Sequence, residues 1–225
     1  FLQRYANSMI LDNNVAQAIN IIKKNENQDN LKFFEAYILL ALDSLKKNNF
    51  DQVDRYLDKS LPFINNDGFK LVIFETLKQY VYVFKEGKIQ PQKKNYGNLT
   101  YISETFQRCY LNDEKTDSFF FNLINNSEGD YSRYIHFYLN YLISIGNFKE
   151  VENIASDLNI IGAPLLLSQT KMWVEDKNFN EFEKIFSCSS SNDLVGEFLF
   201  LISNLYSSQN DFQNSNIYLN LSNYL

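Results

Sequence analysis

Apolar residues recur every three or four positions along most of this chain, and short polar runs rich in Asn and Asp separate the apolar stretches. This period is typical of amphipathic helices, which bury one face. The clearest example is Leu31 to Lys47, where Phe34, Ile38 and Leu45 belong to one wide apolar stripe. The predicted helices cover residues 2–11, 15–25, 31–47, 50–61, 69–85, 100–110, 117–125, 131–145, 148–158, 164–175, 179–186, 194–208 and 212–222.

A short signal recurs at the start of five of these helices: an Asn or Asp, an apolar residue, and a polar residue three positions after the first. An Asn or Asp that accepts from the free N–H groups of a first helical turn, with Glu or Gln three residues on, indicates a capping box. The copies are Asn14 to Gln17, Asn49 to Gln52, Asn147 to Glu150, Asn178 to Glu181 and Asp211 to Asn214.

The apolar residues of these copies are Val15, Phe50, Phe148, Phe179 and Phe212, at steps of 35, 98, 31 and 33 residues. The long step is close to three units of about 33 residues, the period of stacked helical hairpins. The fold class is therefore predicted to be all-α, as one continuous solenoid of helix pairs. Its regular parts are residues 1–65 and 130–225, and an irregular helical segment, 66–129, with a loop at 88–98, lies between them.

The repeats resemble the tetratricopeptide repeat (TPR), whose two helices cross at small residues. Counting the apolar residue of each signal as the seventeenth of a unit, the family expects Gly or Ala at the eighth place and Ala at the twentieth. The eighth places hold Ala6, Ala41, Leu139, Thr170 and Ser203, and the twentieth hold Ala18, Val53, Val151, Phe182 and Ser215. Leu139 and Phe182 depart from the family pattern. The stretch from Ala41 to Phe50 also resembles repeats of α-proteobacterial TPR proteins, and the resemblance implies a right-handed α-solenoid of antiparallel helix pairs.

The net charge of −6 argues against nucleic-acid binding, because phosphate neutralisation needs clustered Lys and Arg. We also expect no membrane span, since the longest apolar run, Phe69 to Phe84, contains Lys70, Glu75 and Lys78. The chain begins with Phe1 rather than Met, so we interpret it as a fragment that a signal or an anchor could precede.

Two cysteines, Cys109 and Cys188, are too few for a disulfide framework. We expect them to be reduced and to pack as small apolar side chains, which fits the cytoplasm. A periplasmic or membrane-associated location is the alternative if a signal or an anchor precedes Phe1.

Candidate chemistry is sparse. His136 is the single histidine, and a lone helical histidine among aromatic residues is usually structural. No Cys or His pair has metal-ligand spacing, and no phosphate-binding loop occurs. The run from Ser187 to Ser191 contains Cys188, but nothing in the sequence places a base beside it. We therefore expect neither catalysis, nor a metal, nor a cofactor.

By resemblance to the TPR family, certain places of each first helix line a concave groove. An Asn amide there can donate to and accept from a peptide backbone at once, and Arg133 and Lys171 could hold a carboxylate. Arg133, His136 and Asn140 share one helical face. The candidate peptide-binding residues are Asn7, Ile38, Leu42, Arg133, His136, Asn140, Lys171, Phe200 and Asn204.

The expected function is a non-catalytic scaffold that binds a peptide or protein segment in this groove. Two alternatives remain open: a structural or assembly subunit that packs through its outer face or ends, and an accessory helical domain of a larger enzyme. The partner and the oligomeric state are not indicated by the sequence.

Overall fold

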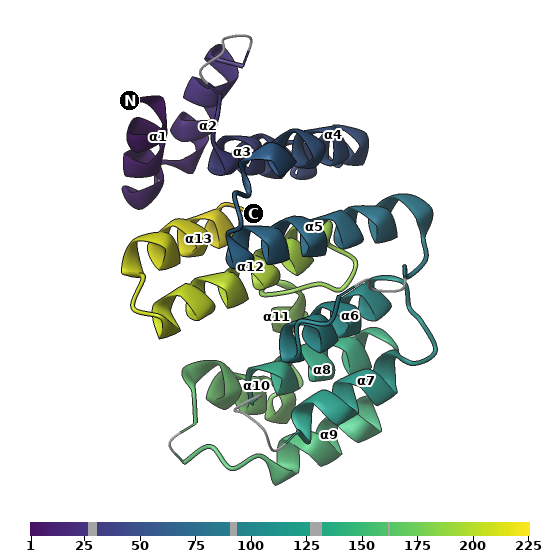
Figure 1. Cartoon of the computed structure of the whole chain (residues 1–225). Helices are drawn as coiled ribbons and strands as arrows, with labels where there is room; N and C mark the ends of the chain where they lie inside the picture. Colours follow the sequence, from purple (N-terminus) through teal and green to yellow (C-terminus); the bar gives the residue numbers. More distant parts are fainter. Residues whose placement is uncertain (27–30, 91–93, 127–131, 162) are drawn as a thin grey trace. The chain divides into compact units, whose positions relative to one another are not determined.

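The computed structural model describes residues 1–26, 31–90, 94–126, 132–161 and 163–225, and within these ranges it is all-helical, with no strand (Figure 1). The start of the predicted helix 131–145 and residues 91–93 of the predicted loop lie outside the described residues. The helices are α1 (Leu2–Leu11), α2 (Val15–Lys24), α3 (Phe34–Leu45), α4 (Phe50–Ser60), a 3-10 turn (Leu61–Phe63), α5 (Gly68–Glu86), α6 (Asn98–Tyr110), α7 (Thr116–Ile124), α8 (Ser132–Ser144), α9 (Phe148–Asp157), α10 (Leu165–Glu175), α11 (Asn180–Glu183), α12 (Ser191–Ser208) and α13 (Phe212–Tyr224).

The predicted all-α class is confirmed, and the described helices begin and end within three residues of the predicted positions. The helix predicted at 179–186 is reduced to the four residues of α11. The residues after Glu183 are held by contacts with α6 and α8 instead, as described below.

The recurrent Asn or Asp signal proves to be mainly a helix stop. In all five copies the preceding residue has a positive φ, and the N–H of the Asn or Asp donates to the carbonyl five residues earlier, as in a Schellman motif. The bonds join Asn14 to Met9 (2.8 Å), Asn49 to Ser44 (3.0 Å), Asn147 to Leu142 (2.9 Å), Asn178 to Trp173 (2.8 Å) and Asp211 to Tyr206 (3.0 Å).

The capping-box interpretation holds for fewer of these starts. The side chain of Asn49 accepts from the Gln52 N–H at 3.2 Å, and that of Asp211 accepts from the Asn214 N–H at 3.1 Å. Asn14 and Asn147 make no such side-chain bond, and α11 begins after Phe179 rather than after Asn178. The shared requirement is therefore the left-handed turn, which Asn and Gly tolerate best.

A sixth turn of the same kind lies within the segment predicted to be irregular. Asn112 has φ 50°, and the Asp113 N–H donates to the Arg108 carbonyl at 3.0 Å. This turn joins α6 to α7 and lies 34 residues before the turn at Asn147. The predicted step of 98 residues between Phe50 and Phe148 therefore contains a further turn of the same type.

The contacts divide the chain into two units, which differs from the predicted partition into 1–65, 66–129 and 130–225. Unit 1 comprises residues 1–103 and 191–225, and unit 2 comprises residues 104–190, so the boundary falls inside α6.

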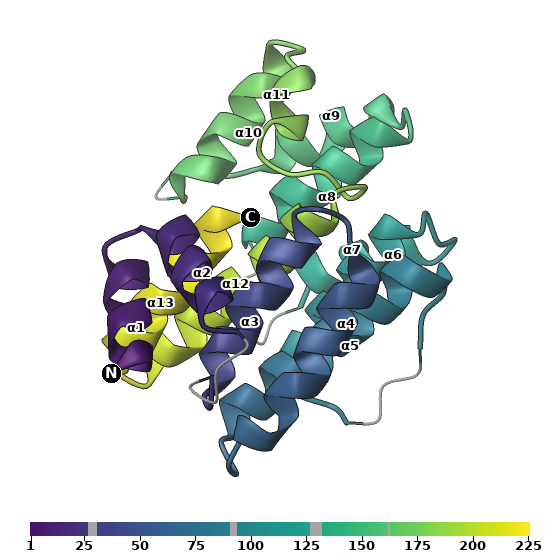
Figure 2. The same cartoon turned by 90° about the horizontal axis from the view of Figure 1, so that it is seen from above.

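In unit 1 the last helices lie against the first, because α13 packs on α1 and α2 while α12 packs on α5 (Figures 1 and 2). The Asn220 amide donates to the Ile10 carbonyl at 2.8 Å, and the Lys46 ammonium lies 4.2 Å from the Tyr224 ring centroid. A row in which each pair contacts only its sequence neighbours would not bring these ends together.

In unit 2, α8 packs against α7, α9 and α10. Its core is aromatic: the Phe106 ring contacts Phe120, Phe137 and Phe186 with centroids 6.0, 5.4 and 5.2 Å away. Such tilted and edge-to-face pairs add to the free energy of burying the rings.

The residues at the predicted helix crossings are buried in both units. All ten eighth and twentieth places are at most 8 % exposed, and the hydroxyl groups of Ser203 and Ser215 meet at 3.2 Å across α12 and α13.

The turn at Gly146 allows a test of the left-handed requirement. Its φ is 75°, and a Cβ added there would meet nothing within 4 Å, so Gly146→Ala should lower the free energy of unfolding by about 1 kcal/mol through backbone strain alone. Gly68→Ala is the matched control, because Gly68 also has open space but lies in the first turn of α5 with an ordinary φ. Urea unfolding followed by far-ultraviolet circular dichroism measures both; equal effects of the two substitutions would contradict this account.

Candidate functional site

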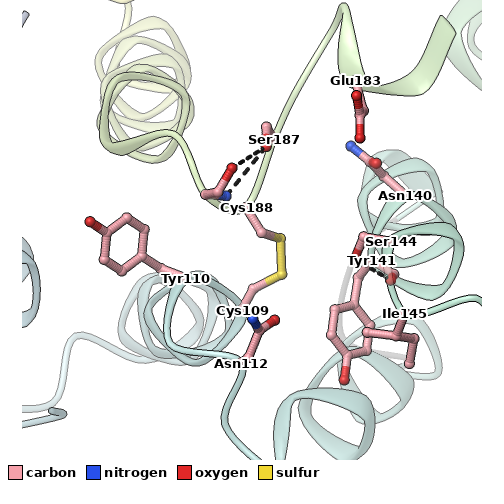
Figure 3. Close-up of a pocket in the computed structure, with 11 residues that line it drawn as sticks. Cys109, Tyr110, Asn112, Asn140, Tyr141, Ser144, Ile145, Glu183, Ser187 and Cys188 are labelled. Carbon is pink, nitrogen blue, oxygen red and sulfur yellow. Dashed lines mark hydrogen bonds between the residues drawn. A yellow bond between two sulfur atoms is a disulfide. The ribbon is translucent and has the colours of Figure 1, made fainter. Parts of the chain in front are cut away.

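A cavity of about 330 Å³ lies in unit 2, between the end of α6, the end of α8 and the segment after α11 (Figure 3). This volume is near the lower end of the range found for small-ligand pockets. Most side chains around it carry hydrogen-bonding groups. The lining residues are Cys109, Tyr110, Asn112, Asn140, Tyr141, Ser144, Ile145, Glu183, Ser187, Cys188 and Ser189.

A disulfide between Cys109 and Cys188 forms one wall of the cavity (Figure 3). The expectation of two reduced cysteines is therefore wrong. Their Cα atoms are 5.4 Å apart although 79 residues separate them in the sequence. Neither spacing nor composition could reveal this proximity, because it depends on how the segment after α11 returns to the end of α6.

Two further contacts hold the same segment. The side-chain amide of Asn140 donates to the Phe186 carbonyl. The Phe186 ring packs on Phe137, with centroids 4.5 Å apart. A covalent bond, a hydrogen bond and a buried ring thus fix this wall of the cavity, so the cavity is formed before any ligand arrives.

Asn140 has hydrogen-bonding capacity left over. The side chain is 4 % exposed and lines the cavity, and its only partner among the described residues is the Phe186 carbonyl. An amide has two N–H donors and an oxygen acceptor, so one N–H and the oxygen remain for a ligand.

Glu183 brings a negative charge to the same side of the cavity as Asn140 (Figure 3). The next residue, Lys184, forms an ion pair with Glu181 instead, at 2.6 Å. No Lys, Arg or His is among the described residues that line the cavity.

His136 lies one helical turn before Asn140 but belongs to the core. Its side chain is fully buried, and its ring stacks on Phe182 with centroids 5.0 Å apart. The Thr170 hydroxyl donates to the Leu166 carbonyl at 2.7 Å, so its single hydrogen is committed there. His136 Nδ1, 2.7 Å from the Thr170 oxygen, must therefore carry the hydrogen and donate it.

The other ring nitrogen of His136, Nε2, is buried and has no hydrogen-bond partner among the described residues. Burial, followed by the positive charge of Arg133, lowers the pKa of His136 to about 4. The imidazole is thus neutral near pH 7, and its placement agrees with the structural interpretation.

The remaining predicted groove residues fall into both units. Ile38 and Leu42 are buried in the core of unit 1, where a ligand would reach them only by displacing neighbours; Asn7 and Phe200 are half-buried there, and Asn204 is exposed. In unit 2, Arg133 lies over the Phe137 ring at 5.2 Å. The Lys171 ammonium donates to the Leu158 carbonyl at 3.0 Å, beyond the end of α9. Asn140 is the predicted residue that lines the cavity.

Sequence reasoning missed most of the cavity wall. Cys109 and Cys188 were interpreted as small apolar side chains, and nothing in the sequence connected them, Tyr110 or Glu183 with a cavity. The Asn112-Asp113 pair did carry a sequence signal, because it resembles the Asn-Asn and Asn-Asp pairs at other turns and lies one repeat length before the turn at Asn147. Asn112 has a positive φ, as those turns do.

Comparison of the chain with protein-family models, with curated proteins and with solved structures found no match. In the part of the chain that the structure describes, no helix combines the length and apolar character needed to cross a membrane. Within the same residues, no cluster of three or more His, Cys, Asp or Glu side chains is placed to share a metal ion.

The buried imidazole predicts how the stability of unit 2 depends on pH. The folded-state pKa of about 4 lies below the unperturbed 6.5, so the unfolded chain binds the proton more readily, and stability present above pH 6.5 is lost as the pH falls towards 4. The full loss is about 3 kcal/mol. Urea unfolding followed by fluorescence of Trp173, the single tryptophan, reports on this region because its ring lies 6.2 Å from that of His136.

His136→Asn is the control, because the amide can still donate to Thr170 but does not titrate. Between pH 7 and pH 5 the unfolding free energy of this variant should change less than that of the original protein. Equal slopes in the two proteins would show that His136 is not the titrating group.

Proposed function

We propose that this protein is a non-catalytic scaffold of TPR-like helical hairpins that holds a segment of another protein in the cavity of unit 2. Six helix-to-helix turns of one backbone type, with buried residues at the helix crossings, support the hairpin architecture. Stacking of such hairpins into a right-handed α-solenoid is part of the proposal, modified in unit 1 by the packing of α13 on α1 and α2.

The main support for a binding function is the set of hydrogen-bonding groups that the Asn140 amide, within the described part of the chain, leaves unpaired in the cavity. It is positioned by the Phe186 carbonyl, lines a cavity formed in advance, and retains one donor and one acceptor without partners among the described residues. A peptide group needs this pair of complementary bonds, and a site fixed before binding loses little conformational entropy when the ligand arrives.

Filling the cavity should abolish binding without affecting the fold. Ser144 is exposed, lines the cavity and donates to the carbonyl three residues earlier, so Ser144→Trp should place an indole ring in the opening. The test is affinity capture from the native source with quantitative mass spectrometry. The amount of each protein that the original chain retains should fall at least about tenfold with this variant, because a blocked pocket removes all contacts within it.

Ser118→Trp is the matched control, since Ser118 is also an exposed helical serine of unit 2 with the same bond to a carbonyl three residues earlier, but it does not line the cavity. Equal capture by the two variants would contradict the proposed function.

The disulfide favours an oxidising compartment, because cytosolic thiols are kept reduced. We therefore propose a periplasmic or other extracytoplasmic location, in place of the cytoplasmic one expected from the two cysteines.

Trapping thiols in intact cells of the native source tests this location. A membrane-permeant alkylating reagent added before lysis should leave Cys109 and Cys188 unmodified, because both sulfur atoms are bonded to each other. Cells reduced before alkylation serve as the control and should show both residues modified by mass spectrometry. Complete modification without prior reduction would place the protein in a reducing compartment.

A further inference from the structure

The net negative charge of this protein arises from one of its two units. Residues 104–190 contain 13 Asp and Glu against 7 Lys and Arg, whereas the rest of the chain contains 14 of each. The formal net charge of −6 therefore belongs to unit 2, and unit 1 is neutral. A field of one sign raises the local concentration of oppositely charged ligands and their association rate.

Inside this acidic unit, the cavity provides acceptors for a cation. Glu183 is the charged residue among the described lining residues, and no ion pair of its carboxylate occurs within the described part of the chain. The nearest cation in sequence, Lys184, is bound to Glu181. The free oxygen of Asn140 lies on the same side of the cavity as Glu183 (Figure 3).

The phenol of Tyr141 adds a neutral polar group to the wall. Burial, followed by the charges of Asp117 and Asp113, raises its pKa, so the hydroxyl stays protonated at neutral pH and adds no second negative charge. One carboxylate with a neutral amide acceptor on the same side of the cavity matches one ammonium or guanidinium group.

We propose that the cavity binds the alkylammonium or guanidinium group of a Lys or Arg side chain, with Glu183 as the charge partner and the Asn140 oxygen as a second acceptor. The inference rests on the proposed function, because it names the chemical class of the segment that the scaffold holds. The volume of about 330 Å³ suits one long side chain rather than a folded helix. A free organic amine offers the same chemistry as the side chain, so the test compares both sources.

The probes are the peptides acetyl-Gly-Gly-X-Gly-Gly-amide, with X as Lys, Arg, Gln or Glu, and n-butylammonium as the free amine. Binding is followed by nuclear magnetic resonance titration of the ¹⁵N-labelled chain at low and at physiological salt. We expect the Lys and Arg peptides to shift the Asn140 side-chain amide signal and to bind at least about tenfold more tightly than the Gln and Glu peptides, because a hydrogen bond to a charged group is the stronger kind. Higher salt should weaken this binding.

Glu183→Gln should reduce the affinity for the Lys peptide about tenfold, because it keeps the shape of the side chain but removes its charge. Glu175→Gln is the matched control: Glu175 is exposed, lies at the end of α10 in the same unit and does not line the cavity, yet the substitution changes the net charge equally. Circular dichroism of both variants should match the original chain, since both side chains are exposed.

The outcomes separate this inference from the proposed function. Loss with Glu183→Gln but not with Glu175→Gln supports the cation site, and tighter binding of the Lys peptide than of n-butylammonium identifies a protein segment as the source. If the free amine binds as tightly as the peptide, the cation site stands but the assignment to a protein segment fails. Equal binding of the Lys and Gln peptides overturns the inference, while a loss of captured proteins with Ser144→Trp would still uphold the scaffold function.

Discussion

The architecture of this protein depends on one repeated backbone turn. In this turn a residue in the left-handed region is followed by a residue whose N–H donates a hydrogen bond to the carbonyl five residues earlier. It occurs at six points that each join two helices, and the next helix begins two to four residues after the left-handed residue. Because each turn is short, helices that follow one another in the sequence lie close together and bury the residues between them. The buried crossings at Ala6, Ala41 and Ser203 follow from that geometry.

The helices and the turns could be predicted from the sequence because their causes are local. The three- and four-residue spacing of apolar side chains and the Asn or Asp at the helix boundaries act over a few residues. The sequence also favoured a structural over a catalytic interpretation of His136, and the structure places its side chain in the core. The turn at Asn112 was missed because Glu114 follows Asp113 where the other copies have an apolar residue.

The cavity could not be predicted because its causes are distant in the sequence. Cys109 and Cys188 are 79 residues apart, and Asn140 is held by a carbonyl 46 residues away. Two of the candidate groove residues taken from the family resemblance, Ile38 and Leu42, are buried for a related reason. In unit 1 the two last helices return to α1, α2 and α5, and the side chains of α3 are almost all buried. Which face of a helix remains accessible depends on everything packed around it, not on its own pattern.

The division into units has a consequence for how the chain is made. Unit 2 is one continuous stretch, residues 104–190, inserted between the two parts of unit 1. During synthesis on the ribosome, the inserted stretch emerges whole, whereas α1, α2 and α5 emerge well before α12 and α13, which pack against them. The amino-terminal part of this protein is therefore completed last, in reverse of the usual order in which domains fold as they are translated.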